Sequence, residues 1–433
     1  MRDGRAIIAD FYNDRDLLPD EEQPEALETV YHNRTRNVKT LFGCIKFQRN
    51  YLHHAKSSSG RFPLDNLLGL EGATTPAVAR LMCRAASRAG SYQEGADDLK
   101  VYAGLHFDAR DLGRMVASVA PGLCEALEKM ESMTETISSS KTSIDVLYAA
   151  CDGTGTPMRR KELEGRKGKQ EDGSARTREA KLGCVFTQTD LDSQGHPLLD
   201  ADGAPMRDPN STSYVGTYKG CREIAVRLHQ EAHRRGLHLA KRVVFIGDGA
   251  AWVWENCRQT FPGAIEILDF YHACEHVGAL ASVIHDMDPD QAASLRSRWC
   301  HEMKQSSPEG LLAESRALLQ KHPEWSKGKR DAIQEQINYL ENHSTRTYYG
   351  RYQKEGLFIG SGVIEAGCKT VIGRRLKQSG MFWSLPGAEN ILNLRCLVLG
   401  PHFDAVWKKR KTLFKKEQLV ARRWSGNKVK QAA

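Results

Sequence analysis

The chain has 433 residues and a formal net charge of +8, with 40% hydrophobic and 27% charged residues. This length is enough for roughly two to four structural units, and the composition excludes a wholly disordered chain. No apolar run approaches the roughly 20 residues needed to cross a bilayer. The charged N-terminus has no secretory core, so the sequence predicts a cytoplasmic protein without membrane contact.

Eleven cysteines are scattered along the chain, and no two of them form a Cys-x-x-Cys pair. An odd and unpatterned set of this kind is typical of reduced cytosolic thiols and not of a disulfide framework.

The N-terminal part divides into a segment over 1–60 and a helical region over 61–136. Within the first, residues 38–52 partly alternate apolar with polar and predict a strand or hairpin. Within the second, two short amphipathic stretches flank Gly104, and Asp108 could cap the second helix. This arrangement is compatible with a DNA-binding helix-turn-helix, and ordinary helical packing is the alternative.

Residues 137–143 read as a linker, after which a series of short apolar strands alternates with helices. The strands are expected at 144–151, 181–189, 212–218, 241–246 and 264–268. Three strands followed by helix–strand–helix–strand is the order of a ribonuclease-H-like α/β fold, a mixed five-stranded sheet flanked by helices. We expect residues 144–272 to form the first part of this core.

The core pattern is interrupted by residues 273–357, where successive helical patterns occur with no strand between them. We expect an all-helical insertion here, followed by the closing helices of the core over 358–400, with Ser361 as an N-cap. The excursion at 159–181 has many charges and no apolar periodicity, which indicates a loop near the site that could grip DNA.

Three acidic residues are the candidates for chemistry. Asp152 and Asp248 follow two of the predicted strands, each before a glycine, and Glu365 lies in the first turns of the closing helix. Strand ends at one edge of an α/β sheet are where ligands collect. Carboxylates without a nearby Cys or His cluster favour a hard cation such as Mg²⁺. The alternative is that each Asp-Gly pair is only a turn.

Further polar residues lie near these acids in the sequence. Asp269 and His272 close the fifth strand and would be accessory groups, unless Asp269 simply caps the next helix. Lys369 is one turn from Glu365, so it would contact the scissile phosphate or form a local ion pair. Basic residues further along the closing helix are candidates for DNA contact: Arg374, Arg375 and Lys377.

The positive charge is concentrated at the C-terminus. Residues 401–433 contain ten Lys or Arg residues and two acidic ones, which accounts for the whole net charge of +8. Clustered cations favour a polyanion, and the interleaved Trp407, Phe414 and Trp424 favour nucleic acid; a merely solubilising tail is the alternative. The candidate DNA-binding residues here are Lys408, Lys409, Arg410, Lys411, Lys415 and Lys416.

Several motifs together resemble the DDE transposases of bacterial insertion sequences, and most of all the Kra-type group allied to the Mutator-like superfamily. The resemblance spans about residues 38–400, and its most specific block is GSGVIEAGCKTVIGRRLKQSGMFW at 360–383. The other matching segments are FPLDNLLGL at 62–70, Asp152-Gly-Thr-Gly, Gly247-Asp-Gly-Ala with Trp252, and Asp269-Phe-Tyr-His272.

The resemblance implies a ribonuclease-H-like core in which Asp152, Asp248 and Glu365 are the catalytic triad. It also implies that Asp269 and His272 match an accessory Asp-x-x-His motif. The expected reaction is cleavage of transposon ends and transfer of the 3′-hydroxyl into target DNA. Two Mg²⁺ ions per site, replaceable by Mn²⁺, would serve this reaction. The expected partners are the terminal repeats and target DNA as duplexes, with the protein acting as a homodimer or higher oligomer at the bacterial nucleoid.

One segment departs from the group's pattern. Relatives often carry a two-cysteine knuckle before residue 62, where this chain reads YLHHAKSSSG at 51–60. His53 and His54 alone are a poor zinc site because four ligands are normally needed, so we expect no structural zinc. Three rival functions are a nuclease without strand transfer, an inactive domesticated DNA-binding protein and, more remotely, a carboxylate-pair glycosidase.

Overall fold

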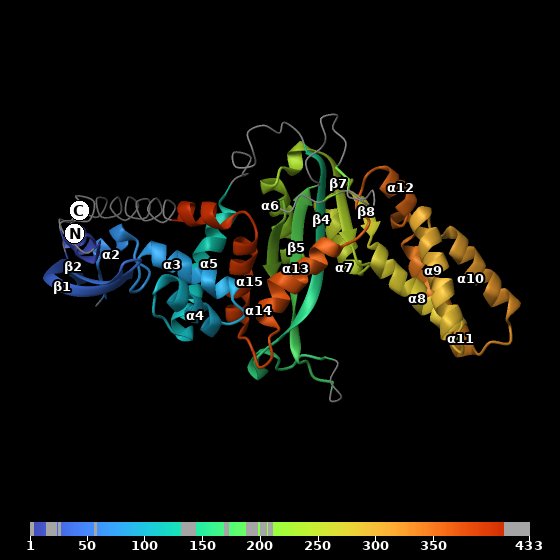
Figure 1. Ribbon diagram of the computed structural model, residues 1–433, viewed down its shortest axis with the longest axis horizontal. Coiled ribbons are helices and arrows are strands. Elements are labelled where there is room, and N and C mark those ends of the chain that lie inside the picture. Colours follow the sequence, from blue (N-terminus) through green and yellow to red (C-terminus); the bar gives the residue numbers. More distant parts are fainter. Residues whose placement is uncertain are drawn as a thin grey trace, which may run out of the picture. The chain divides into compact units, whose positions relative to one another are not determined.

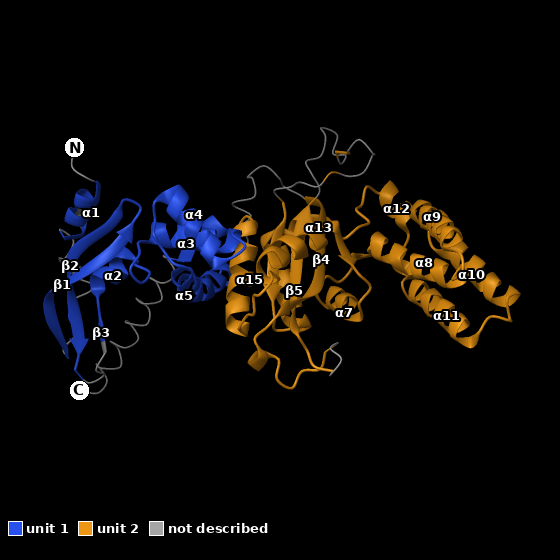
Figure 2. Cartoon of the chain, turned by 60° about the horizontal axis from the view of Figure 1, so that its bottom comes forward, with its two compact units in different colours: residues 1–129, 402–433 blue, residues 130–401 orange. Residues whose placement is uncertain are grey.

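The chain forms two compact units, which are residues 1–129 with 402–433 and residues 130–401 (Figure 2). The computed structural model describes residues 4–13, 24, 27–55, 59–130, 144–168, 173–187, 198–199, 206 and 211–410. The predicted linker at 137–143 lies outside these residues. No helix among them is long and apolar enough to span a membrane.

The first unit begins with a small antiparallel sheet in the order β1-β2-β3. Val38, Ile45 and Phe47 face the same side of the hairpin and form its core with Leu64. Helix α1 packs on β2, so the apolar face of the hairpin is covered. The elements are α1 (Gly4–Asn13), β1 (Glu28–Thr40), β2 (Gly43–His54), β3 (Ser59–Arg61) and α2 (Pro63–Leu68).

Three helices follow, namely α3 (Pro76–Arg88), α4 (Tyr92–Ala103) and α5 (Ala109–Glu128). Helix α4 ends at Gly104, whose positive φ of 63° suits a residue without a side chain. Helix α5 begins at Asp108, which forms a capping box with Asp111. The two helices around Gly104 and the cap at Asp108 are therefore confirmed. Val101 of α4 is 74% exposed.

Residues 403–410 are also helical and belong to the first unit. Phe403, Val406 and Trp407 are buried, and the Arg80 guanidinium lies 2.6 Å from the Asp404 carboxylate. Trp407 was expected to interleave with DNA-binding charges, but its burial in the protein corrects that interpretation. Phe414 and Trp424 lie outside the described residues.

The second unit contains the predicted five-stranded mixed sheet, with strand order β6-β5-β4-β7-β8. Strands β4, β5 and β6 pair antiparallel, whereas β7 runs parallel to β4, and β8 parallel to β7. The sheet and its helices are consistent with a ribonuclease-H-like core. Its strands are β4 (Ile144–Pro157), β5 (Thr177–Thr187), β6 (Ser213–Thr217), β7 (Ala240–Gly247) and β8 (Ile265–Leu268).

Helices cover both faces of this sheet (Figure 1). Gly183 of β5 lies against Leu228 of α6, whereas the neighbouring Leu182 lies against Gly367 of α13 on the opposite face. Alternate residues of a strand point to opposite faces, so β5 packs on both sides. The flanking helices are α6 (Cys221–Arg234), α7 (Ala251–Thr260), α13 (Gly362–Gly367), α14 (Arg374–Leu376) and α15 (Leu385–Leu399).

Between β8 and α13, residues 270–354 are fully described and contain helices without a strand. Trp299 is completely buried among them, and its indole N–H donates to Glu314 at 2.7 Å. The helices are α8 (Phe270–Ile284), α9 (Pro289–Gln305), α10 (Glu309–Lys321), α11 (Lys327–Asn342) and α12 (Tyr349–Lys354).

Two local expectations differ from the structure. Strand β4 does not stop before Asp152 but continues to Pro157, because β5 pairs with it as far as Thr177. For the same reason the expected loop at 159–181 is shorter: its last residues belong to β5, and Lys167 bridges to Ser174. Polar side chains concealed this strand because they occupy an extension with little burial.

Candidate active site

Asp152 and Asp248 lie at the same edge of the sheet. The last parallel pair between β4 and β7 is Ala150 with Ile246, and each acid comes two residues later along the chain. Asp248 accepts a hydrogen bond from the backbone N–H of Ala250 at 3.0 Å, which fixes the turn after β7. The structure therefore brings these two predicted acids together.

The environment of Asp152 disfavours its charged form. Burial raises the pKa of this carboxyl, and the negative charge of Asp248 raises it further. Hydrogen bonds from the Gly153 N–H at 2.5 Å and the Cys368 thiol at 3.4 Å oppose the shift only in part. Two nearby carboxylates of this kind are stabilised by a cation between them.

Glu365 lies on α13, which packs against β4 and β5. Its Oε1 accepts from the Ser361 hydroxyl at 2.9 Å. Ser361 occupies the expected N-cap position, but its side chain bonds Glu365 and does not cap the helix. Cys368, three residues after Glu365, contacts Asp152, so this helical face is joined directly to β4.

The helix changes form just beyond Glu365. Residues Cys368–Gly373 are π-helical, with α14 directly after them. Short π-helical segments inside helices occur frequently at functional sites. Lys369 lies within this π-helical segment. Lys369 is exposed and remains a candidate for phosphate contact.

Asp269 combines two contacts in one buried side chain that is 2% exposed. Its Oδ1 accepts from the His272 N–H at 2.6 Å, so it caps α8 as the alternative interpretation expected. Its Oδ2 also accepts from the backbone N–H of Ser361. Asp269 therefore links the start of α8 to the turn that carries Glu365, and no local pattern in the sequence indicated this second bond.

The His272 ring takes no part in the contact between Asp269 and Ser361. Its Nδ1 lies 3.2 Å from Glu275, and its ring packs near those of His276 and Tyr339. Within the described residues, no hydrogen bond joins its ring to Asp152, Asp248 or Glu365. The two residues of the expected accessory pair thus have different surroundings.

The predicted DNA-contacting residues divide into accessible and buried ones. Arg374, Lys408 and Lys409 are exposed, and Lys377 donates to the Thr154 hydroxyl on β4. Arg375 is 1% exposed, with its guanidinium 5.1 Å from the centre of the Trp383 ring, so the expectation that it contacts DNA is wrong. Arg410 pairs with Glu71 inside the first unit. Lys411, Lys415 and Lys416 lie outside the described residues.

Two further residues near the acids were not singled out from the sequence. The Tyr339 hydroxyl donates to the backbone carbonyl of Asp248 at 3.1 Å. Lys181, which is 5% exposed, lies with its Nζ 3.7 Å from the centre of the Trp252 ring. Tyr339 is distant in sequence and had no local signal. Lys181 could have been found as a charge at the start of a run of apolar residues.

The donor chemistry of the site fits a hard cation. Asp152, Asp248 and Glu365 offer carboxylate oxygens, the ligand type that Mg²⁺ prefers. In the parts of the chain that the structure describes, however, no three acidic, His or Cys side chains are already gathered as a ligand set. Asp248 is near enough to Asp152 for its charge to raise the pKa of Asp152, and Glu365 is oriented by its hydrogen bond from the Ser361 hydroxyl.

Gly249 connects Asp248 to α7 in a backbone conformation that favours glycine, with φ of +94°. A Cβ at this position would lie 2.1 Å from the Tyr339 hydroxyl. Gly263 has a similar φ of +83° but open space around its Cα, so it is a matched control. We expect Gly263→Ala to lower the free energy of unfolding by about 1–2 kcal/mol, and Gly249→Ala by more. Equal losses of unfolding free energy in the two variants, measured by chemical denaturation, would contradict the close approach of Gly249 to Tyr339.

The chain matches no protein-family model, and comparison with curated proteins gives no match. Among solved structures it is similar to a Drosophila P element transposase strand transfer complex, with a TM-score of 0.34 and 8% sequence identity. The alignment covers 76% of this chain and 93% of the other.

Proposed function

We propose that the chain is a metal-dependent DNA transposase that cleaves transposon ends and joins the 3′-hydroxyl to target DNA. The observation that carries the proposal is the meeting of Asp152, on β4, with Asp248, directly after the parallel strand β7. The helical segment of Glu365 is joined to Asp152 through Cys368. The strand order of the sheet is the one expected for a ribonuclease-H-like core.

The chemistry assigned to this site is phosphoryl transfer. Asp152, Asp248 and Glu365 would hold Mg²⁺, which when bound polarises phosphate oxygens and lowers the pKa of water. The residues of the chain have separate tasks. Cys368 orients one oxygen of Asp152, Ser361 orients Glu365, and Asp269 holds Ser361 in place. Lys369 and Lys377 supply positive charge on the same helical segment.

The proposal is tested with the purified protein and the DNA that flanks its own gene. A labelled 3′-end should be joined covalently to a target plasmid when Mg²⁺ or Mn²⁺ is added. Cleavage without joining would identify a nuclease, and neither reaction under conditions where DNA binds would identify an inactive DNA-binding protein. Both outcomes would overturn the proposed activity.

DNA binding is assigned to the helices α3–α5, the hairpin β1–β2 and the basic C-terminal segment.

The contribution of the basic C-terminal segment can be tested by deletion. Because residues 403–410 pack into the first unit, the charges to remove are the seven Lys and Arg residues beyond position 410. We expect deletion of 411–433 to flatten the plot of log affinity against log salt, since each neutralised phosphate contributes about 0.9 to the slope. A variant with these seven residues changed to Gln controls for length. An unchanged slope would identify a solubilising tail.

A further inference from the structure

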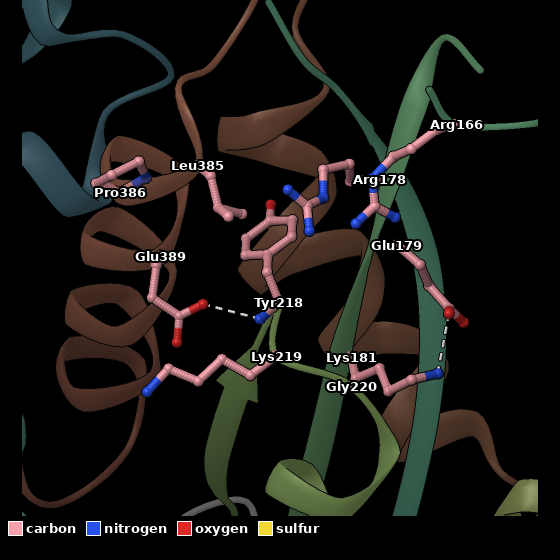
Figure 3. A pocket seen from close by; sticks show the side chains of 10 residues that line it. All are labelled: Arg166, Arg178, Glu179, Lys181, Tyr218, Lys219, Gly220, Leu385, Pro386 and Glu389. Atoms are coloured by element: carbon pink, nitrogen blue, oxygen red, sulfur yellow. Dashed lines mark hydrogen bonds and ion pairs between the residues drawn. The ribbon is translucent and has the colours of Figure 1, made fainter. Parts of the chain in front are cut away.

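A basic groove lies beside the acids in the second unit. It has a volume of about 660 Å³ and is formed by the ends of β5 and β6 with the first turns of α6 and α15 (Figure 3). Two acidic residues, Glu179 and Glu389, face four basic ones: Arg166, Arg178, Lys181 and Lys219.

Both carboxylates in the groove already have partners. Glu179 accepts from Lys181 Nζ at 2.9 Å. Glu389 accepts from the Tyr218 backbone N–H at 2.8 Å and lies 3.3 Å from the Arg227 guanidinium. These bonds neutralise Lys181 and hold Glu389 against the end of β6, so neither acid is available to balance the remaining cations of the groove.

Arg166 and Arg178 are not neutralised by an ion pair of this kind. Their guanidinium groups lie side by side in Figure 3, and no carboxylate among the described residues forms an ion pair with either. Burial, and then the charge of Arg166, lower the pKa of Arg178, and the charge of Glu162 opposes this shift with a smaller effect. Arg178 is half-buried and Arg166 is exposed. Two adjacent cations that form no ion pair with an acid in the described part of the chain favour binding of an anion.

The N-terminus of α6 adds to the preference of the groove for an anion. Gly220 lines the groove and is the N-cap of α6, a helix of 14 residues whose first turn has no side-chain cap. Its backbone N–H groups and the positive end of the helix dipole favour negative charge at this point. Lys219, beside Gly220, is 4.0 Å from its nearest acidic partner, Glu223.

The pairing of β5 with β4 places the groove residues of β5 near Asp152. Lys181 is opposite Gly153, next to Asp152, and Arg178 is opposite Thr156, four residues beyond Asp152. At roughly 3.3 Å per residue, Arg178 is about 13 Å from Asp152 along the strand. This distance corresponds to about four base pairs of B-form DNA at roughly 3.4 Å each.

We propose that the groove binds the sugar–phosphate backbone of a DNA strand, with Arg166 and Arg178 each contacting a phosphate a few nucleotides from the bond that is cleaved. This inference rests on the proposed function for its substrate but not on catalysis. The groove would hold the strand in register with Asp152 and Asp248, through contacts that carry no base specificity.

The test is equilibrium binding of duplex DNA without metal, measured as a function of salt, so it does not depend on cleavage. In Arg166→Gln/Arg178→Gln we expect the slope of log affinity against log salt to fall by about two, one for each phosphate that is no longer neutralised. Arg166→Lys/Arg178→Lys should restore most of the slope. Lys321→Gln/Lys327→Gln removes two exposed charges elsewhere and should leave the slope unchanged.

An unchanged slope in the Gln variant, with its melting temperature preserved, would overturn the inference. So would a thermal shift by inorganic phosphate or a mononucleotide that disappears in the variant while DNA binding stays normal, because that result assigns the groove to a small anion. A wild-type protein that binds DNA through the groove but never cuts it would instead contradict the proposed function alone. If the Gln variant does not fold, the slopes of the single Arg166→Gln and Arg178→Gln variants decide.

Discussion

Asp152→Asn and Asp248→Asn are each expected to reduce single-turnover DNA cleavage by at least about 1,000-fold, since metal-ion catalysis supplies several kcal/mol. Each change removes one negative charge at nearly constant shape. Glu365→Gln should have a similar effect. DNA binding measured without metal should be retained or become slightly tighter, because each change removes a negative charge that repels phosphates. Substantial cleavage by any of these variants would remove that residue from the site.

The same substitution at Asp152 has an expected effect on stability. A folded-state pKa above the unfolded value means that the folded protein disfavours the charged carboxyl, and this cost is present at neutral pH and disappears as pH falls. Asp152→Asn should therefore raise the melting temperature at pH 7, with a gain that shrinks toward pH 4. Asp290→Asn, at an exposed position in α9, is the control. A lower melting temperature for Asp152→Asn would contradict the assigned environment.

Asp269→Asn is expected to slow cleavage by roughly 10–100-fold, the usual loss when a group that orients a metal ligand is changed. Asn can still accept from the His272 N–H and cap α8. Its amide nitrogen, however, cannot accept the Ser361 N–H, so the turn that holds Glu365 is released. The Mg²⁺ concentration for half-maximal rate should rise, which a purely structural loss would not produce.

Two comparisons isolate this link. Ser361→Ala should show the same shift in Mg²⁺ dependence because it frees Glu365 from its hydroxyl partner, and Ser361→Thr should restore the wild-type value. His272→Ala should cleave at a nearly normal rate, since its ring contacts Glu275 and not the acids. Normal Mg²⁺ dependence in both Asp269→Asn and Ser361→Ala would reduce Asp269 to a helix cap.

Much of the sheet could be predicted because its signals are local. Buried apolar runs located all five strands, and the order of strands and helices was enough to expect a mixed sheet. The length of β4 could not be predicted. Beyond Asp152 its residues are Gly, Thr and Pro, and only pairing with the polar end of β5 makes them a strand. Pairing between distant segments leaves no local periodicity.

In the candidate site, too, the residues with local sequence signals could be predicted and the long-range contacts could not. Asp152 and Asp248 were found because each closely follows an apolar run, and the sheet brings such positions together. Arg375 was misassigned because its charge alone does not show which face of a helix is buried. In the structure the ring of Trp383, eight residues later in the chain, packs against its guanidinium. The bond from Asp269 to Ser361 joins residues far apart in sequence, so only the fold could reveal it.

The central claim is that a hard metal ion binds between Asp152 of β4 and Asp248 after β7, and iron-directed cleavage of the protein backbone tests it most directly. Fe²⁺ binds oxygen sites at least as readily as Mn²⁺, and with ascorbate and peroxide it generates radicals that cut the chain near the ion. We predict cuts next to Asp152 and Asp248 that excess Mg²⁺ suppresses and that vanish in Asp152→Asn/Asp248→Asn. Cuts confined to other segments, or a pattern unchanged in that double variant, would contradict the account.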